Sequence, residues 1–121
     1  MSSKVFDISY LSVDSIQEGV GASQIVPLIK TLASQGKKVC LTTCEKFPPP
    51  NSLQLELADA GVSWIILEYG KNGAISGLLR LGKLYLNMPR AKVIHARSDI
   101  PAVAAVLRFP SGKILWDVRS L

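Results

Sequence analysis

Residues 5–43 of the chain read VFDISYLSVDSIQEGVGASQIVPLIKTLASQGKKVCLTT, and the spacing of their apolar side chains changes twice. The run over Val5–Leu11 is rich in β-branched and aromatic residues and predicts a strand, followed by a loop over Ser12–Gly21. Apolar side chains at helical spacing over Ser23–Gln35 predict a helix that ends at a glycine. A second β-rich run covers Lys38–Thr43. The order predicts a βαβ unit, whose two strands are parallel.

The same alternation continues to the end of the chain. We expect further strands over Ser63–Leu67, Lys92–Ala96 and Lys113–Val118, and helices over Asn51–Ala60, Ile75–Met88 and Pro101–Phe109. Right-handed crossovers then favour an α/β fold, a Rossmann-like three-layer parallel sheet of five strands in the order 3-2-1-4-5. No helix is expected after the last strand. We therefore predict that residues 1–121 form a single partial domain that is incomplete at the C-terminus.

Side chains that accept hydrogen bonds stand at the predicted helix starts. We expect Asn51 or Ser52 to cap the helix over 51–60, and Ser98 or Asp99 to cap the helix that begins near Pro101.

Composition excludes several classes of protein. An apolar content of 48% and a charged content of 19% exclude intrinsic disorder. No apolar run reaches the ~18 residues of a membrane span, and Asp7 interrupts the N-terminal apolar run that a signal peptide needs. Cys40 and Cys44 would stand ~13 Å apart on one strand, too far for a disulfide. We expect a reduced, cytoplasmic protein.

Positive charge is concentrated in the second half of the chain. Residues 1–70 carry five basic and seven acidic residues, whereas residues 71–121 carry nine basic and two acidic ones. Such a half favours an anionic partner, such as a phosphate or a lipid headgroup, although a lysine-rich solvated surface has the same composition. We expect no nucleic-acid partner.

The predicted strand order places a ligand site. The direction of winding reverses between the first and fourth strands, and open α/β sheets bind ligands at the carboxyl ends beside such a point. Those ends carry the loop over Ser12–Gly21 and the segment His95–Asp99. Gly19 and Gly21 precede a helix start, whose N–H groups suit an anion. Gln24 stands where the dinucleotide fingerprint needs glycine, so that motif is absent. An ordinary flexible loop is the alternative to a phosphate or sugar contact.

Two pairs of polar side chains stand at the carboxyl ends of the last two predicted strands. His95 and Arg97 share one face of a strand and offer a titrating imidazole and a guanidinium fork for phosphate. Asp117 and Arg119 have the same spacing. The alternative for His95 is a semi-buried structural histidine beside a surface arginine. The alternative for Asp117 and Arg119 is an ion pair at the end of the chain. One histidine and two strand cysteines provide no set of ligands for a metal.

The helix over Ile75–Met88 reads ISGLLRLGKLYLNM. Leucines beside Arg80 and Lys83 suit either a packing helix with a basic rim or a helix that lies on an anionic membrane surface. The sequence leaves both open.

Three segments, residues 8–46, 93–105 and 114–120, together resemble the amino-terminal half of family-four glycosyltransferases of the GT-B fold. The glycine, serine and glutamine at a helix start match Gly21, Ser23 and Gln24. The family's His-Ala-Arg-Ser segment matches His95–Ser98, and its Phe-Asp-Met-Arg-Gly segment is similar to residues 116–120. Ser120 replaces the family's usual glycine.

The resemblance implies a retaining transfer of a sugar from a nucleotide-sugar donor to a glycan or lipid-linked acceptor, as in polysaccharide biosynthesis, without a further cofactor. It gives His95 a catalytic role. The substrate contacts that it implies are Gly19, Gly21, Ser23, Gln24, Arg97, Ser98, Asp117 and Arg119. The family's nucleotide site lies in a second domain, so we expect a missing C-terminal domain or partner chain and no turnover by this chain alone. A lipid-linked acceptor would place the protein at the inner face of the membrane.

Two other functions remain open. A non-catalytic phosphate- or nucleotide-binding α/β module would bind its ligand without a second domain, and a gene fragment would have no autonomous activity.

Overall fold

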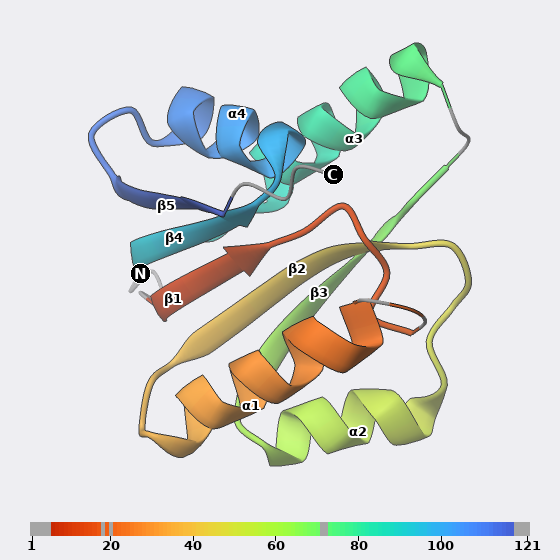
Figure 1. Cartoon of the computed structure of the whole chain (residues 1–121), viewed down its shortest axis with the longest axis vertical. Coiled ribbons are helices and arrows are strands. Elements are labelled where there is room, and N and C mark those ends of the chain that lie inside the picture. Colours follow the sequence, from red (N-terminus) through yellow and green to blue (C-terminus); the bar gives the residue numbers. More distant parts are fainter. Residues whose placement is uncertain (1–5, 18, 20, 71–72, 118–121) are drawn as a thin grey trace.

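The computed structural model describes residues 6–17, 19, 21–70 and 73–117, and these form three layers (Figure 1). The five strands are all parallel and stand in the order β3-β2-β1-β4-β5, which confirms the predicted Rossmann-like α/β class. The strands are β1 (Phe6–Leu11), β2 (Val39–Glu45), β3 (Val62–Glu68), β4 (Ala91–Arg97) and β5 (Lys113–Asp117). The helices are the π-helical turn η1 (Gly21–Ile25), α1 (Val26–Ser34), α2 (Asn51–Asp59), α3 (Ala74–Asn87) and α4 (Asp99–Arg108).

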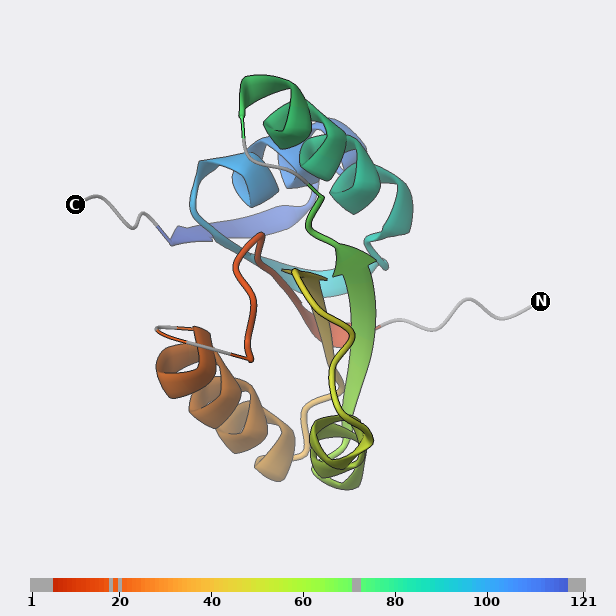
Figure 2. The ribbon, with the colours of Figure 1, turned by 90° about the vertical axis from the view of Figure 1, so that its right-hand side faces the viewer.

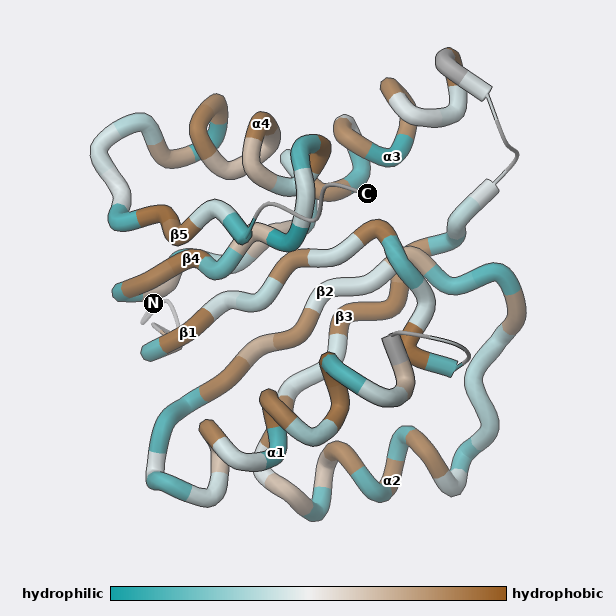
Figure 3. The backbone as a smooth tube through the Cα atoms, viewed as in Figure 1, coloured by the Kyte–Doolittle hydropathy of each residue, from teal (hydrophilic) through white to brown (hydrophobic). Residues whose placement is uncertain are grey.

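The sheet separates two apolar cores, and Figure 2 shows a pair of helices on each side of it. Tyr10 and Leu11 follow each other on the central strand β1 and point to opposite faces, as the strand period requires. Tyr10 packs with Ile25 and Ile29 in the core beneath α1 and α2. Leu11 packs with residues such as Leu84 in the core beneath α3 and α4. Figure 3 shows the corresponding hydrophobic segments along the strands.

The segment predicted as one helix over Ser23–Gln35 contains two consecutive helical elements. Its first part is the π-helical turn η1, and the α-helix itself begins only at Val26. Pro27 explains the change, because it lacks the N–H that would donate to the carbonyl of Ser23 in an α-helix. The polar residues of the predicted ligand loop therefore lie in a wider turn.

None of the residues predicted to cap α2 and α4 makes a capping hydrogen bond. Pro50 stands at the N-cap of α2, and neither Asn51 nor Ser52 makes a capping hydrogen bond because both lie inside the helix. Ser98 stands at the N-cap of α4, but its side chain makes no capping bond, and Asp99 is the first helical residue. Proline at −66° already has the backbone angle that a helix entrance needs, so α2 begins without a side-chain acceptor.

Both β2 and β4 run further toward the site than predicted. β2 continues to Glu45, which pairs in register with Glu68 of β3, and β4 continues to Arg97, which pairs with Asp117 of β5. Each added pair brings a charged side chain to the carboxyl end of the sheet.

The two cysteines both lie on β2, where they are buried and free. Burial raises the pKa of Cys40 and that of Cys44 to about 11. Within residues 6–17, 19, 21–70 and 73–117, no helix is long and apolar enough to cross a bilayer.

Candidate functional site

Arg97 joins the two turns that the sequence predicted to converge. It is the last residue of β4, while Asp14 lies in the loop after β1 and Gln24 lies in η1. Its Nε lies 3.4 Å from Asp14 Oδ2, and its Nη2 lies 3.3 Å from Gln24 Oε1. Because β1 and β4 are neighbouring parallel strands, their carboxyl ends meet at one edge (Figure 1). These three residues define the rim of the candidate site.

The charge of Arg97 is weakly compensated. The residue is 4% exposed, and both contacts of its guanidinium lie at the long end of the hydrogen-bond range. Its third nitrogen, Nη1, makes no hydrogen bond to any residue that the structure describes. A buried cation is stabilised by close, charged acceptors. The side chain of Asp14 is 57% exposed, so solvent reaches the carboxylate that pairs with Arg97.

Glu45 anchors the loop that carries the rim. The residue is 3% exposed, and its carboxylate accepts hydrogen bonds from Ser15 Oγ at 2.7 Å, from the backbone N–H of Ile16 at 3.2 Å and from Gln17 Nε2 at 2.9 Å. The hydroxyl of Thr43 donates to it as well. Four donors around one carboxylate satisfy its oxygens without a cation. The loop before Gly19 and Gly21 is thereby tied to the end of β2.

His95 precedes Arg97 by two residues and therefore lies on the same face of β4. Its Nε2 lies 3.3 Å from Asp117 Oδ2 on β5, and its ring lies 4.4 Å from that of Tyr10, centroid to centroid. An imidazole held between a carboxylate and an aromatic ring has a fixed orientation. Leu115 of β5 is the register partner of His95 and is exposed, so this part of the sheet is open to solvent beside the rim. We call the surface formed by His95, Leu115 and Asp117 the shelf.

Ser98 has a strained backbone. Its φ of 73° and ψ of −175° lie in a region that glycine alone adopts freely, and no other non-glycine residue in the described part of the chain has a positive φ. Its N–H donates to the carbonyl of Asp117 at 2.9 Å, which holds the turn between β4 and α4 against β5. Such strain is concentrated at functional sites and costs of order 1–3 kcal/mol.

The remaining predicted site residues fall into two groups. Gly21, Ser23 and Gln24 lie in η1, and Gly19 precedes it with a φ of 59°, which glycine adopts without strain. Arg119 and Ser120 lie outside the described residues. The structure therefore brings Gln24 into contact with Arg97 and His95 into contact with Asp117. Gly21 and Ser23 share η1 with Gln24, and Ser98 directly follows Arg97.

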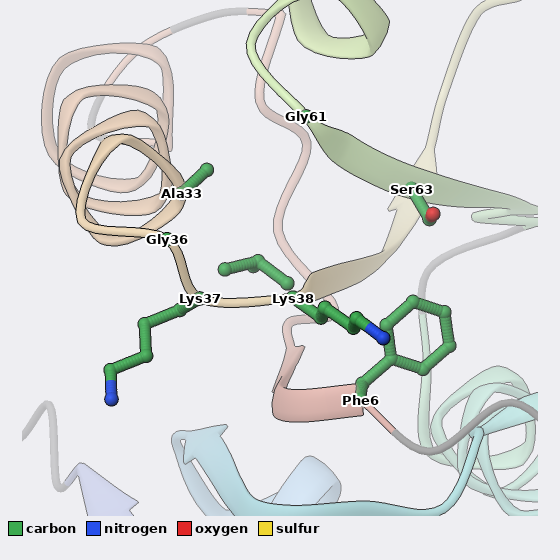
Figure 4. A pocket seen from close by; sticks show the side chains of 8 residues that line it. Phe6, Ala33, Gly36, Lys37, Lys38, Gly61 and Ser63 are labelled. Atoms are coloured by element: carbon green, nitrogen blue, oxygen red, sulfur yellow. The ribbon is translucent and has the colours of Figure 1, made fainter.

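A separate hollow of about 420 Å³ lies at the opposite edge of the sheet (Figure 4). Its lining includes Phe6, Lys38 and Ser63 at the amino-terminal ends of the strands, together with the end of α1. Figure 4 shows that Lys37 points away from Lys38, so the two cations do not converge on one ligand. The strand order places binding at the carboxyl ends instead.

Sequence reasoning missed Asp14 and Glu45. Asp14 stands in a loop that was singled out only for its glycines. Glu45 lies just beyond the predicted end of β2, where a glutamate suggests solvent. The available signal was the spacing of Thr43 and Glu45, which puts both side chains on the face of the sheet that α1 covers.

The chain was compared with protein-family models, with curated proteins and with solved structures, and none of the three comparisons found a match.

Proposed function

We propose that this chain is the acceptor-side half of a glycosyltransferase that moves a sugar from a nucleotide-sugar donor to a glycan or lipid-linked acceptor, with retention at the transferred carbon. The observation that carries the proposal is the weakly compensated guanidinium of Arg97 between the loop after β1 and η1. It stands at the point of the sheet where open α/β folds bind their ligands.

Arg97 and η1 suit a departing diphosphate. Sugar transfer leaves negative charge on the diphosphate, and preorganised cations and N–H groups stabilise that charge. Arg97 is held before any ligand arrives, so little reorganisation is needed when the charge develops. In this proposal the phosphate displaces Asp14, while Gln24 keeps Arg97 in place.

His95 suits the sugar or the acceptor hydroxyl. Asp117 and Tyr10 fix the imidazole, and the neighbouring Leu115 leaves an open shelf on which a sugar ring can lie. A second domain, as the resemblance implies, would hold the nucleotide base. On this proposal the chain alone binds the phosphate end of the donor and transfers no sugar.

Calorimetric titration of the chain tests the proposal. The probes are UDP-glucose, ADP-glucose, GDP-mannose, inorganic pyrophosphate and uridine. We expect the four phosphate-containing probes to bind with similar affinities, because the rim recognises the diphosphate and not the base, and we expect uridine not to bind. Arg97→Lys loses the planar fork and should weaken binding by about tenfold. Arg108→Lys, at the exposed end of α4, is the matched control and should bind as the wild type does.

Two results contradict the proposal in different ways. Absence of binding by every phosphate probe overturns the site itself. Selection of one base over the others by more than about tenfold favours the nucleotide-binding module, because that module reads the base without a second domain.

Transfer is tested directly by fusing the chain to a donor-binding domain and following sugar release. His95→Ala should reduce transfer substantially while the affinity for pyrophosphate stays unchanged. An unchanged transfer rate removes His95 from the site.

A further inference from the structure

The outward side of α3 is apolar. Ile75, Leu78, Leu79 and Leu86 recur at helical spacing on one side of the helix and are between 60% and 77% exposed. The opposite side packs into the core through Leu84 and Met88. The helix thus has two apolar sides, whereas an ordinary surface helix has one.

The expected basic rim of α3 is largely absent. Arg80 is buried, lies 4.1 Å from the ring of Tyr69 and donates to the carbonyl of that residue. Lys83 donates to the carbonyl of Glu68. Both cations are thus engaged with the end of β3 and the residue after it, and the outward side of α3 presents mainly its aliphatic residues.

The neighbouring helix α4 extends this surface. Val103, Val106 and Leu107 are about half exposed on its outward side. Gly77 of α3 lies close to Ile100 of α4, which brings the helices into contact, and Figure 2 shows the two side by side. We call the seven outward aliphatic residues of the two helices the α3–α4 face. Figure 3 shows hydrophobic segments along both helices. Exposed aliphatic residues in this number on two helices that pack together are typical of an interaction surface.

Charge identifies the kind of partner. Residues 73–117, which include α3 and α4, carry seven basic and two acidic residues, whereas residues 21–70, which include α1 and α2, carry four of each. Of the seven, Arg80 and Arg97 are buried, Lys83 bonds to β3 and Lys92 pairs with Asp7. The others, Arg90, Arg108 and Lys113, are exposed after α3, at the end of α4 and at the start of β5. The guanidinium of Arg108 lies 5.8 Å from the ring of Tyr85 on α3. An apolar face with basic residues at its border is complementary to anionic lipid headgroups over an acyl layer.

We propose that the α3–α4 face docks on an anionic lipid bilayer, with its aliphatic side chains at the boundary between headgroups and acyl chains and its basic border among the headgroups. The proposal is independent of sugar transfer, since the face lies on the helices and the rim lies at the carboxyl ends of the strands. It would hold for a chain of any activity.

Vesicle flotation of the 121-residue chain tests it. We expect the chain to float with phosphatidylcholine vesicles that contain phosphatidylglycerol, to bind pure phosphatidylcholine much more weakly, and to dissociate as salt is raised. Leu78→Gln combined with Leu86→Gln should weaken binding by about tenfold or more, because both side chains leave the acyl boundary. Leu55→Gln is the matched control: it is 61% exposed on α2, in the electrically neutral part of the chain, and should bind as the wild type does. Circular dichroism checks that all variants are folded.

A second pair of variants isolates the charges. Arg90→Gln with Arg108→Gln should lose the preference for phosphatidylglycerol, and Lys37→Gln, in the loop between α1 and β2, should keep it. Failure of the wild-type chain to float with anionic vesicles overturns the proposal, as does equal loss in the Leu55→Gln control. Concentration-dependent dimerisation that Leu78→Gln abolishes also overturns it, because the face is then covered by a second copy of the chain.

Discussion

Glu45 accepts a hydrogen bond from Ser15 at 2.7 Å across 30 positions of the chain, and this contact joins the end of β2 to the loop after β1. The same loop meets Arg97 of β4 at Asp14. The candidate site is thus bordered by three neighbouring strands, and its loop is held by side chains from the strands on either side of β1.

Glu45→Gln should loosen this loop. The amide has one acceptor oxygen where the carboxylate has two, so at least one buried donor loses its partner, at a cost of about 1–3 kcal/mol. Urea unfolding measures the loss, and hydrogen exchange at residues 15–17 should become faster. Glu68→Gln is the control, since Glu68 is the exposed register partner of Glu45. Equal losses in both variants would show that the hydrogen bonds of Glu45 do not stabilise the loop.

Asp14→Asn should increase the affinity for pyrophosphate a few-fold. The carboxylate of Asp14 occupies Arg97 and repels an approaching anion, whereas an amide repels it much less. Asp14 is exposed, so little stability should be lost. The measurement is calorimetric titration beside Asp59→Asn, which removes an exposed carboxylate from α2. Weaker binding by Asp14→Asn would mean that Asp14 contacts the ligand instead of competing with it.

Ser98→Gly should stabilise the protein by about 1 kcal/mol. Glycine adopts the observed backbone angles without strain, and this gain exceeds the entropy that glycine adds to the unfolded chain. The midpoint of urea unfolding should rise for Ser98→Gly and fall for Ser98→Val, while Ser111→Gly in an exposed turn should leave it nearly unchanged or lower it. A fall for Ser98→Gly would indicate that the serine side chain stabilises the turn.

The two cysteines should make the fold sensitive to alkaline pH. Burial raises the pKa of both thiols from about 9 to about 11, so the folded chain keeps protons that the unfolded chain releases. Stability is therefore full below pH 9 and falls as the pH rises from about 9 toward 11. Urea unfolding across this range measures the effect, and the chain with both cysteines changed to alanine should show a smaller fall. A thiol reagent should react with both cysteines only after unfolding; rapid reaction at neutral pH would contradict the burial.

The sequence predicted the fold because each apolar run has a clear period. The alternation of strands and helices implies parallel strands, right-handed crossovers limit their order, and the order in turn places Arg97 beside the loop after β1. That part of the site depends on topology alone. It needed no knowledge of side-chain contacts.

Other features depend on contacts between distant residues and could not be predicted. Arg80 was expected at the surface but is buried, because Tyr69 offers both a ring and a carbonyl to its guanidinium. Glu45 is buried because the loop after β1 supplies its donors. The π-helical turn before Val26 required attention to the missing N–H of Pro27, which the apolar spacing does not reveal.

The strand order places the two tryptophans of the chain on opposite edges of the sheet, Trp64 on β3 and Trp116 on β5. Trp64 donates through Nε1 to Thr43 Oγ1 at 2.9 Å, and Thr43 in turn donates to Glu45. Trp116 is half exposed at the other margin. Fluorescence from each indole therefore monitors a different edge of the sheet. Variants that keep one tryptophan distinguish a structural change near Glu45, reported by Trp64, from a change at β5, reported by Trp116.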